Sequence, residues 1–330
     1  MAISKIKIEN FTVFNDIAVN FNSGINVIMG ENGAGKTHLL KLLYSFCNHE
    51  MSDEYNKNMM SHMLGCFKNT KPDLFRNPQK AIELKFDLSG KDFHFTIFPS
   101  ENAAHSQPAK ATAAPSVYIP AKDMLTHSKG LLEMAKKYSK DMPFDKTLLD
   151  ITEKSRQWRT DEMSPIAKNV IPRIENIIGG EIIVENDTFF VQKTDGMKIE
   201  FSLEAEGIKK IGLLWQLLMN ESIAAGTVLL WDEPEANINP KLIPALVEIM
   251  LELSRNGVQI FVATHDYILA KYFEVKRKKN DRVLFHSLYQ TESGGVKCES
   301  NENFRDLQNN SIITAFDELM DEVIYQNLGD

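Results

Sequence analysis

The most constraining stretch is Gly30-Glu31-Asn32-Gly33-Ala34-Gly35-Lys36-Thr37, which fits the pattern of a phosphate-binding loop. An apolar run, residues 25–29, precedes it as a buried strand, and residues 38–43 follow it as a helix. Glycines let the backbone turn tightly and aim N–H groups at phosphate oxygens, and the helix N-terminus adds partial positive charge. Strand, complete motif and helix together make a chance glycine-rich turn the weaker interpretation. The sequence therefore predicts a nucleotide site.

Within this loop, two side chains are assigned separate tasks. The Lys36 ammonium is expected to reach the β- and γ-phosphates, and the Thr37 hydroxyl is expected to bind Mg²⁺. We include His38, the next residue, in the predicted nucleotide-binding set. ATP and Mg²⁺ are accordingly the expected cofactors, and the rest of the chain is read for residues that complete an ATPase.

Composition narrows the class of protein further. The chain has 330 residues, a net charge of −8 and ordinary hydrophobic and charged contents, which favours a cytoplasmic globular protein. No apolar run approaches the roughly 20 residues of a membrane span, and the N-terminus alternates like a strand without a signal peptide's apolar core. The net negative charge argues against coating DNA by charge alone. Scattered Cys47, Cys66 and Cys298 argue against a disulfide framework or a zinc site.

A second motif supplies two acids at the end of an apolar strand. Residues 227–231 lead into Asp232 and Glu233, which is the Walker B pattern. Asp232 is expected beside the Mg²⁺, and Glu233 one residue further on is expected to polarise the attacking water as general base. Two acids after a strand also fit an ordinary strand exit, but the upstream loop and the run Pro234–Pro240 favour the functional interpretation.

A family resemblance rests on two long runs. Lys7-Ile8-Glu9-Asn10-Phe11 followed by residues 21–37, and Asp-Glu-Pro-Glu-Ala-Asn-Ile-Asn-Pro at 232–240, resemble the SMC, RecF and OLD-type ATPases. These are ABC-class ATPases that are not transporter subunits. The resemblance implies an α/β fold: a P-loop ABC-type ATPase head with an N-terminal antiparallel β-subdomain and an inserted helical lobe. We expect the two parts of the head at 1–122 and 179–330, with the lobe at 123–178.

The resemblance also implies that ATP is bound between two heads that dimerise head to tail. Asn237 and Asn239 then belong to the D-loop, which crosses the dimer interface near the partner's ATP. His265, directly after the apolar strand 259–264, is the switch residue that contacts the γ-phosphate. A lone histidine is more often structural, but its place after a buried strand soon after Walker B favours function.

The signature run of transporter-type relatives is degenerate here. Ala205, Glu206 and Gly207 stand at its place, before a helix over 208–218, and Ala205 lacks the serine hydroxyl. Lys209 or Lys210 is a candidate for supplying charge instead. A weaker contact to the partner's nucleotide implies slow or partner-dependent hydrolysis. The alternative, that this helix merely packs, remains open.

In the ATPases that this chain resembles, a Q-loop glutamine at the end of a strand faces the metal and the attacking water. Its counterpart in this sequence is less defined. Asp123 or Lys122 follows the short core strand 116–119 at that place. Asp123 is therefore either a further metal-facing residue or a helix N-cap.

Other segments are assigned by pattern alone. Hairpins are expected over 6–21 and 81–98, no clear pattern marks 45–80, and 99–114 is predicted as an exposed loop. Pro143 and Pro165 divide the lobe into three helices, and a strand meander is expected over 181–201. An amphipathic helix with apolar residues from Ile312 to Ile324 and acids on its other face lies near the C-terminus. The basic run 276–279 fits a solvated loop or a strip for nucleic acid.

Three functions follow as expectations. A short ATPase of this kind resembles the ATPase components of bacterial anti-phage and toxin-type systems, in which the effector, such as a nuclease or toxin, is a separate protein. Too few residues follow His265 for the nuclease domain of OLD-type proteins, so we predict a homo-oligomeric ATPase that controls a separate effector. The alternatives are a RecF-like DNA-repair clamp and, less favoured because of the poor signature run, a transporter subunit.

Overall fold

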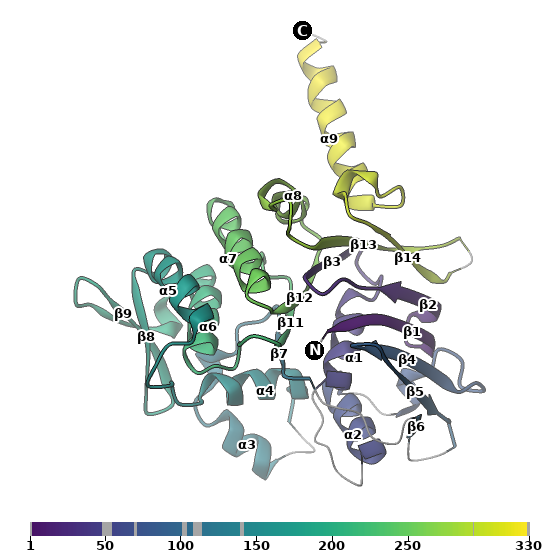
Figure 1. The fold of residues 1–330 in the computed structure, drawn as a ribbon, viewed down its shortest axis with the longest axis horizontal. Coiled ribbons are helices and arrows are strands. Elements are labelled where there is room, and N and C mark those ends of the chain that lie inside the picture. Colours follow the sequence, from purple (N-terminus) through teal and green to yellow (C-terminus); the bar gives the residue numbers. More distant parts are fainter. Residues whose placement is uncertain are drawn as a thin grey trace.

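The computed structural model describes residues 2–47, 55–68, 71–100, 104–107, 114–138, 142–292 and 294–328 (Figure 1). A six-stranded sheet lies at its centre in the order β14-β13-β3-β12-β11-β7. All neighbouring pairs are parallel except β13 with β14. Its strands are β3 (Ile25–Gly30), β7 (Ser116–Ile119), β11 (Val228–Asp232), β12 (Gln259–Thr264), β13 (Val283–Gln290) and β14 (Val296–Asn301).

The parallel strands are buried on both faces. Along β11, Leu229 and Trp231 face one hydrophobic cluster while Val228 and Leu230 face the other. This explains why their sequences are continuous apolar runs rather than alternating ones. The first cluster includes residues of α5 (Pro165–Ile178), α6 (Glu206–Met219) and α7 (Ile243–Arg255), and the second includes residues of α1 (Lys36–Cys47).

The second cluster is shared with an antiparallel sheet of order β2-β1-β4-β5-β6. Its strands are β1 (Ile3–Phe11), β2 (Phe14–Asn20), β4 (Ile82–Leu88), β5 (Lys91–Ile97) and β6 (Ala104–Gln107). Both predicted hairpins are confirmed by the pairings of β1 with β2 and β4 with β5. The expectation of a loop over 99–114 is wrong at β6, which pairs with the open edge of β5; residues 101–103 and 108–113 lie outside the described residues.

The segment 123–178 contains α3 (Leu131–Lys137), α4 (Lys146–Ser155) and α5, after the short 3-10 turn η2 (Leu125–His127). Asp145 caps α4 by accepting the Thr147 and Leu148 N–H groups, and Ser164 caps α5 with Pro165 in its first turn. The predicted meander is confirmed as the sheet β10-β9-β8, formed by β8 (Gly180–Glu185), β9 (Thr188–Lys193) and β10 (Lys198–Glu200).

The remaining helices are α2 (Tyr55–Phe67), α8 (Tyr267–Lys276) and α9 (Ser311–Leu328). α2 lies in the stretch that had no clear sequence pattern and contacts α1 and α4. α9 confirms the predicted C-terminal helix and extends away from the sheets at the top of Figure 1.

One buried histidine on the central sheet makes folding sensitive to acid. His286 on β13 is fully buried between Asn26 and Ser300, and burial lowers its pKa to about 3. Between this value and the ordinary value near 6.5, the unfolded chain binds a proton that the folded chain excludes. Stability contributed by neutral His286 is therefore present above that range and is lost as the pH falls through it.

We expect the free energy of unfolding to fall by about 1 kcal/mol per pH unit below pH ~6 because of this residue. Urea unfolding of wild type and His286→Gln between pH ~7 and ~5 measures the difference, since the variant lacks the titrating ring. Equal pH slopes for the two proteins would contradict the assignment.

Candidate nucleotide-binding site

The phosphate-loop sequence forms a tight turn between β3 and α1. Gly33 and Gly35 have φ angles of 82° and 92°, which side-chain-bearing residues rarely adopt. A Cβ at Gly30 would lie 2.3 Å from the Leu288 carbonyl oxygen, so this position has no room for one. Glu31 to Gly33 are exposed at the tip of the loop, and Ala34 is buried beneath it. The backbone therefore has the cradle geometry that the motif predicts.

The Lys36 side chain lies inside this turn. Its Nζ donates hydrogen bonds to the carbonyl oxygens of Gly30 at 2.6 Å and Glu31 at 3.0 Å. Burial lowers the pKa of Lys36, while the carboxylates of Glu233 and Asp232 act in the opposite direction. The ammonium group is thus held next to where phosphate oxygens would enter.

Thr37 and Asp232, 195 positions apart in the sequence, meet directly. The Thr37 hydroxyl donates to Asp232 Oδ2 at 2.9 Å. They come together because β3 and β11 flank β12 as parallel strands, so their carboxyl ends share one edge of the sheet. These are two of the three residues that the sequence assigned to Mg²⁺.

Tyr118 is a member of the site that sequence analysis did not identify. It lies on β7, beside Leu230 of β11, and its hydroxyl donates to the same Asp232 Oδ2 at 3.1 Å. Burial raises the pKa of Asp232, and the hydrogen bonds from Thr37 and Tyr118 oppose that rise. The only sequence signal was its hydroxyl group, in a short core strand whose first residue, Ser116, also carries one.

Glu233 and His265 form a second pair at the same edge. His265 Nδ1 lies 3.3 Å from Glu233 Oε1, and both side chains are partly exposed. Glu233 adopts a φ of 47°, an uncommon backbone conformation for a residue with a side chain. Its N–H donates to the Ala263 carbonyl, and its own carbonyl accepts from the Ala236 N–H. The carboxylate and the imidazole therefore lie together above the ends of β11 and β12.

A buried carboxyl lies two residues further along. Glu235 is 8% exposed, and its Oε1 accepts the Thr264 hydroxyl at 2.6 Å, whereas Oε2 has no hydrogen-bond partner among the described residues. Burial raises the pKa of Glu235, and the hydrogen bond from Thr264 opposes the rise. This contact joins the segment after β11 to the end of β12.

The signature-like residues open α6. Ala205 is its exposed N-cap residue, Glu206 begins the helix and Gly207 is buried. A Cβ at Gly207 would contact Ile238 and the Asn237 carbonyl at 3.5–3.7 Å, so α6 begins against the predicted D-loop of the same chain. Asn237 has a φ of 61°, and the Asn239 side chain caps the following turn by accepting the Lys241 N–H.

The suggestion that Lys209 or Lys210 replaces the missing signature hydroxyl does not fit the structure. Both lysines are 5% exposed. Lys209 Nζ donates to Glu206 at 2.7 Å, and Lys210 Nζ donates to the Glu233 carbonyl oxygen at 2.9 Å. Their ammonium groups are therefore engaged within the chain, and Lys210 instead links α6 to the backbone of Glu233.

Two other sequence assignments have local partners. Asp123 accepts the Leu125 N–H at 2.9 Å and also bonds Thr126, so its carboxylate is engaged in a local turn, although the N-cap residue of η2 is Met124. Lys122 is exposed. His38 Nδ1 lies 3.0 Å from the Thr12 hydroxyl, and burial lowers its pKa. We therefore leave Asp123 and Lys122 out of the site described here.

The oxygen ligands near Thr37 suit Mg²⁺ better than a metal ion that is coordinated by protein side chains alone. Within the described residues, no group of three or more His, Cys, Asp or Glu side chains has the arrangement of a metal site. Mg²⁺ commonly takes one or two protein oxygens and completes its shell with phosphate and water. The Thr37 hydroxyl and the Asp232 carboxylate fit that requirement.

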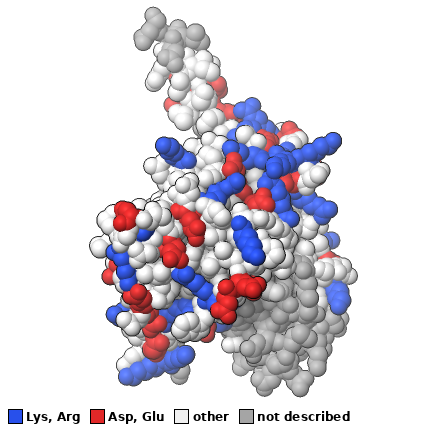
Figure 2. Space-filling model, turned by 60° about the vertical axis from the view of Figure 1, so that its left-hand side comes forward, with Lys and Arg blue, Asp and Glu red and all other residues white. Residues whose placement is uncertain are grey.

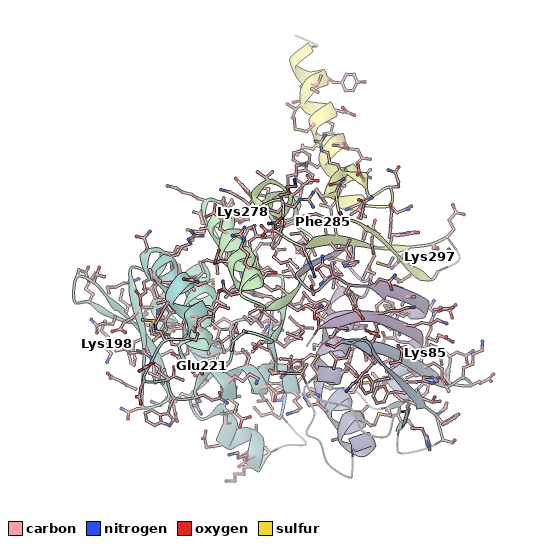
Figure 3. The ribbon with its side chains drawn as sticks, in the orientation of Figure 1. Lys85, Lys198, Glu221, Lys278, Phe285 and Lys297 are labelled. Carbon is pink, nitrogen blue, oxygen red and sulfur yellow. The ribbon has the colours of Figure 1, made fainter. Side chains whose placement is uncertain are left out.

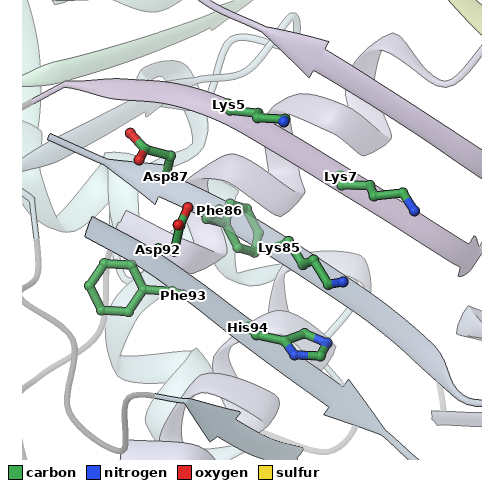
Figure 4. A pocket seen from close by; sticks show the side chains of 8 residues that line it. All are labelled: Lys5, Lys7, Lys85, Phe86, Asp87, Asp92, Phe93 and His94. Carbon is green, nitrogen blue, oxygen red and sulfur yellow. The ribbon is translucent and has the colours of Figure 1, made fainter. Parts of the chain in front are cut away.

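A pocket of about 490 Å³ lies elsewhere, on the antiparallel sheet (Figure 4). Lysines 5, 7 and 85 and His94 line it together with Asp87 and Asp92. Lys7 is paired with Glu9 at 2.5 Å and His94 with Glu83. Its charges are thus mixed and it shares no residue with the phosphate loop.

In the described part of the chain, no helix is both long and apolar enough to cross a membrane.

Comparisons with known families cover most of the chain in two parts. Residues 1–140 match the AAA ATPase domain family, and residues 128–270 match the family described as "AAA domain, putative AbiEii toxin, Type IV TA system". The first match contains the phosphate loop. The second contains Asp232, Glu233 and His265.

Curated relatives match over shorter stretches. The chain is 30% identical over 98 residues to the DNA replication and repair protein RecF of Cytophaga hutchinsonii, covering 29% of this chain and 26% of that protein. It is 46% identical over 44 residues to RecF of Pediococcus pentosaceus, covering 13% and 12%. It is 38% identical over 58 residues to the L-cystine import ATP-binding protein TcyN of Bacillus subtilis, covering 18% and 20%. The matches thus span about a quarter or less of these relatives.

Solved structures match along nearly the whole chain. An Smc head bound to the C-terminal winged-helix domain of ScpA aligns with a TM-score of 0.58 at 13% identity, covering 93% of this chain and 99% of that chain. An Smc head domain with an extended coiled coil, bound to a ScpA domain and derived from Pyrococcus furiosus, aligns with a TM-score of 0.55 at 11% identity, covering 98% and 99%. These likenesses show the fold. The ATPase family matches and the RecF relatives, on this fold, support an ABC ATPase of the SMC/RecF type.

Proposed function

We propose that this chain is a Mg²⁺-dependent ATPase that binds ATP between two copies and controls a separate effector protein in bacterial anti-phage defence. The observation that carries the ATPase part is the edge of the central sheet, where Thr37 meets Asp232 and Glu233 meets His265. The defence role rests on the family label that names a toxin–antitoxin system. The proposal that the effector is a separate protein rests on the resemblance of the sequence to ATPase components of anti-phage and toxin-type systems.

In this proposal, each residue acts on ATP through an atom already described. The loop N–H groups and Lys36 Nζ bind the phosphate oxygens, with Lys36 leaving its carbonyl partners in the loop. Thr37 and Asp232 hold Mg²⁺, which neutralises charge on the β- and γ-phosphates when bound. Glu233 accepts a proton from the attacking water, and His265 donates a hydrogen bond to the γ-phosphate.

Two features support control by a second chain. Ala205 presents no hydroxyl, and both nearby lysines are engaged inside their own chain. A phosphate that meets α6 of another copy would therefore find mainly backbone N–H donors. We infer that closure of the two copies is weak and that hydrolysis is slow or completed by a partner.

The first test replaces the proposed base. Glu233→Gln keeps the size of the side chain but removes its ability to take a proton, so phosphate release should fall about a hundredfold or more. Trapped ATP should convert the protein into a larger assembly, measured as solution mass with and without Mg·ATP. Glu302→Gln, an exposed glutamate, is the matched control and should behave as wild type. An unchanged rate in Glu233→Gln would refute the base assignment.

A second test addresses Tyr118. Tyr118→Phe removes one hydrogen bond from Asp232, so the Mg²⁺ concentration for half-maximal ATPase activity should rise about tenfold. Tyr44→Phe is the matched control. The Tyr44 hydroxyl donates a hydrogen bond to Asp150 Oδ2 at 2.8 Å and none to Asp232. If both variants shift the Mg²⁺ requirement equally, Tyr118 has no special role at the metal.

A RecF-like, ATP-dependent DNA clamp is the second candidate, favoured by the RecF matches. Such a clamp needs a basic strip. The face in Figure 2 carries basic and acidic residues intermixed. In the basic run, Lys276 is paired with Glu248 at 2.7 Å, and Arg277 bonds Asn303. We therefore rank the clamp below effector control.

We expect Glu233→Gln to bind duplex DNA no more tightly with ATP than without it. A titration at several salt concentrations measures this, with Lys278→Gln/Lys279→Gln as the comparison variant. The clamp would be favoured instead if DNA binding required ATP, if the logarithm of the binding constant fell linearly with the logarithm of the salt concentration, and if the lysine variant bound DNA more weakly.

A further inference from the structure

Lys210 on α6 is a buried lysine that bonds to the backbone of the proposed base. The helix packs against α4, α5 and β8, and Glu221, which is labelled in Figure 3, lies just after its C-terminal end (Figures 1 and 3). Lys210 is 5% exposed. Among the described residues, the Glu233 carbonyl oxygen is the one hydrogen-bond partner of its ammonium group, at 2.9 Å. Burying an ammonium group costs free energy that an apolar side chain here would not, so this contact needs an explanation.

The backbone of Glu233 adopts a conformation that needs support. Its φ of 47° is uncommon for a residue with a side chain. The Glu233 N–H donates to the Ala263 carbonyl at 2.9 Å, and the Glu233 carbonyl accepts from the Ala236 N–H at 3.1 Å. These two contacts come from β12 and from the turn itself. The third contact, from Lys210, is therefore the one that ties this backbone to a helix.

The ammonium group also lies among carboxylates. Burial lowers the pKa of Lys210, whereas the charges of Glu235 and Glu233 act in the opposite direction. Glu235 is itself buried, and its Oε2 has no hydrogen-bond partner among the described residues. The neighbouring negative charges therefore stabilise the ammonium group where it lies, close to the backbone that it supports.

We propose that Lys210 is a positioning residue for hydrolysis, which holds the backbone of Glu233 so that the carboxylate faces the attacking water beside His265. This inference rests on the proposed function, in which Glu233 is the base. Lys210 acts through a backbone carbonyl, so it sets the direction of the Glu233 side chain rather than its chemistry. Because α6 begins at the signature-like residues, the same contact links the helix end that would meet a second copy's phosphate to the base of its own chain.

The competing explanation is that Lys210 merely stabilises α6, and Gln216 on the same helix separates the two. Gln216 is 2% exposed, and its Nε2 donates to the Ser155 carbonyl oxygen at 2.9 Å. Both side chains thus bond a backbone carbonyl from one helix at the same distance, but Ser155 ends α4 and is no part of the nucleotide site. Methionine in place of either keeps an unbranched chain and removes one hydrogen bond.

The first readout is steady-state phosphate release by wild type and the variants. Lys210→Met should lower kcat about tenfold or more and leave KM for ATP unchanged, since a misaligned base slows the chemical step while the phosphate loop is intact. Lys210→Arg keeps a charged donor and should recover part of the lost rate, and Gln216→Met should turn over as wild type. An unchanged kcat in Lys210→Met, or an equal fall in both methionine variants, overturns the proposal.

The second readout needs no nucleotide. Hydrogen exchange of the Ala236 amide, which donates to the Glu233 carbonyl, reports whether the turn is held. This exchange should be about tenfold faster in Lys210→Met than in wild type and unchanged in Gln216→Met. Equal exchange in wild type and Lys210→Met overturns the proposal. If wild type releases no phosphate, the proposed function fails, and the exchange rate still decides whether Lys210 holds the backbone of Glu233.

Discussion

The hydrogen bond between Thr37 and Asp232 is the contact on which the site depends. It joins the first turn of α1 to the end of β11, and it forms only if β3, β12 and β11 are parallel and in register. The register is in turn set by apolar side chains that alternate between the two clusters. Any slip of one strand would exchange those faces and separate Thr37 from Asp232. Packing and chemistry therefore impose the same constraint on this sheet.

The uncommon backbone of Glu233 is the second constraint. A φ of 47° costs energy for a residue with a side chain, so neighbouring contacts must hold it. Its carbonyl accepts from the Ala236 N–H and from Lys210 Nζ, and its N–H donates to Ala263. The buried Lys210 thereby connects the helix that begins at the signature-like residues with the backbone of the proposed base. Movement of α6 would therefore shift the backbone of Glu233 through Lys210 without any change in the phosphate loop.

Sequence reasoning recovered the elements whose residues carry a local signal. The glycines of the phosphate loop, the apolar run before Asp232 and the two hairpins each have a pattern that few other structures satisfy. It missed α2 and β6, which are specified by contacts with distant residues rather than by their own periodicity. It also missed Tyr118, because this hydroxyl lies four strands before Asp232 in the chain and comes near it only where β7 lies beside β11.

The two lysines near the start of α6 illustrate the same limit. From sequence, Lys209 and Lys210 follow a degenerate signature and look available to a phosphate. In the fold both are buried, because the helix presents them to carboxylate and carbonyl oxygens of their own chain. The chain therefore has fewer groups to offer a partner's nucleotide than its sequence suggests.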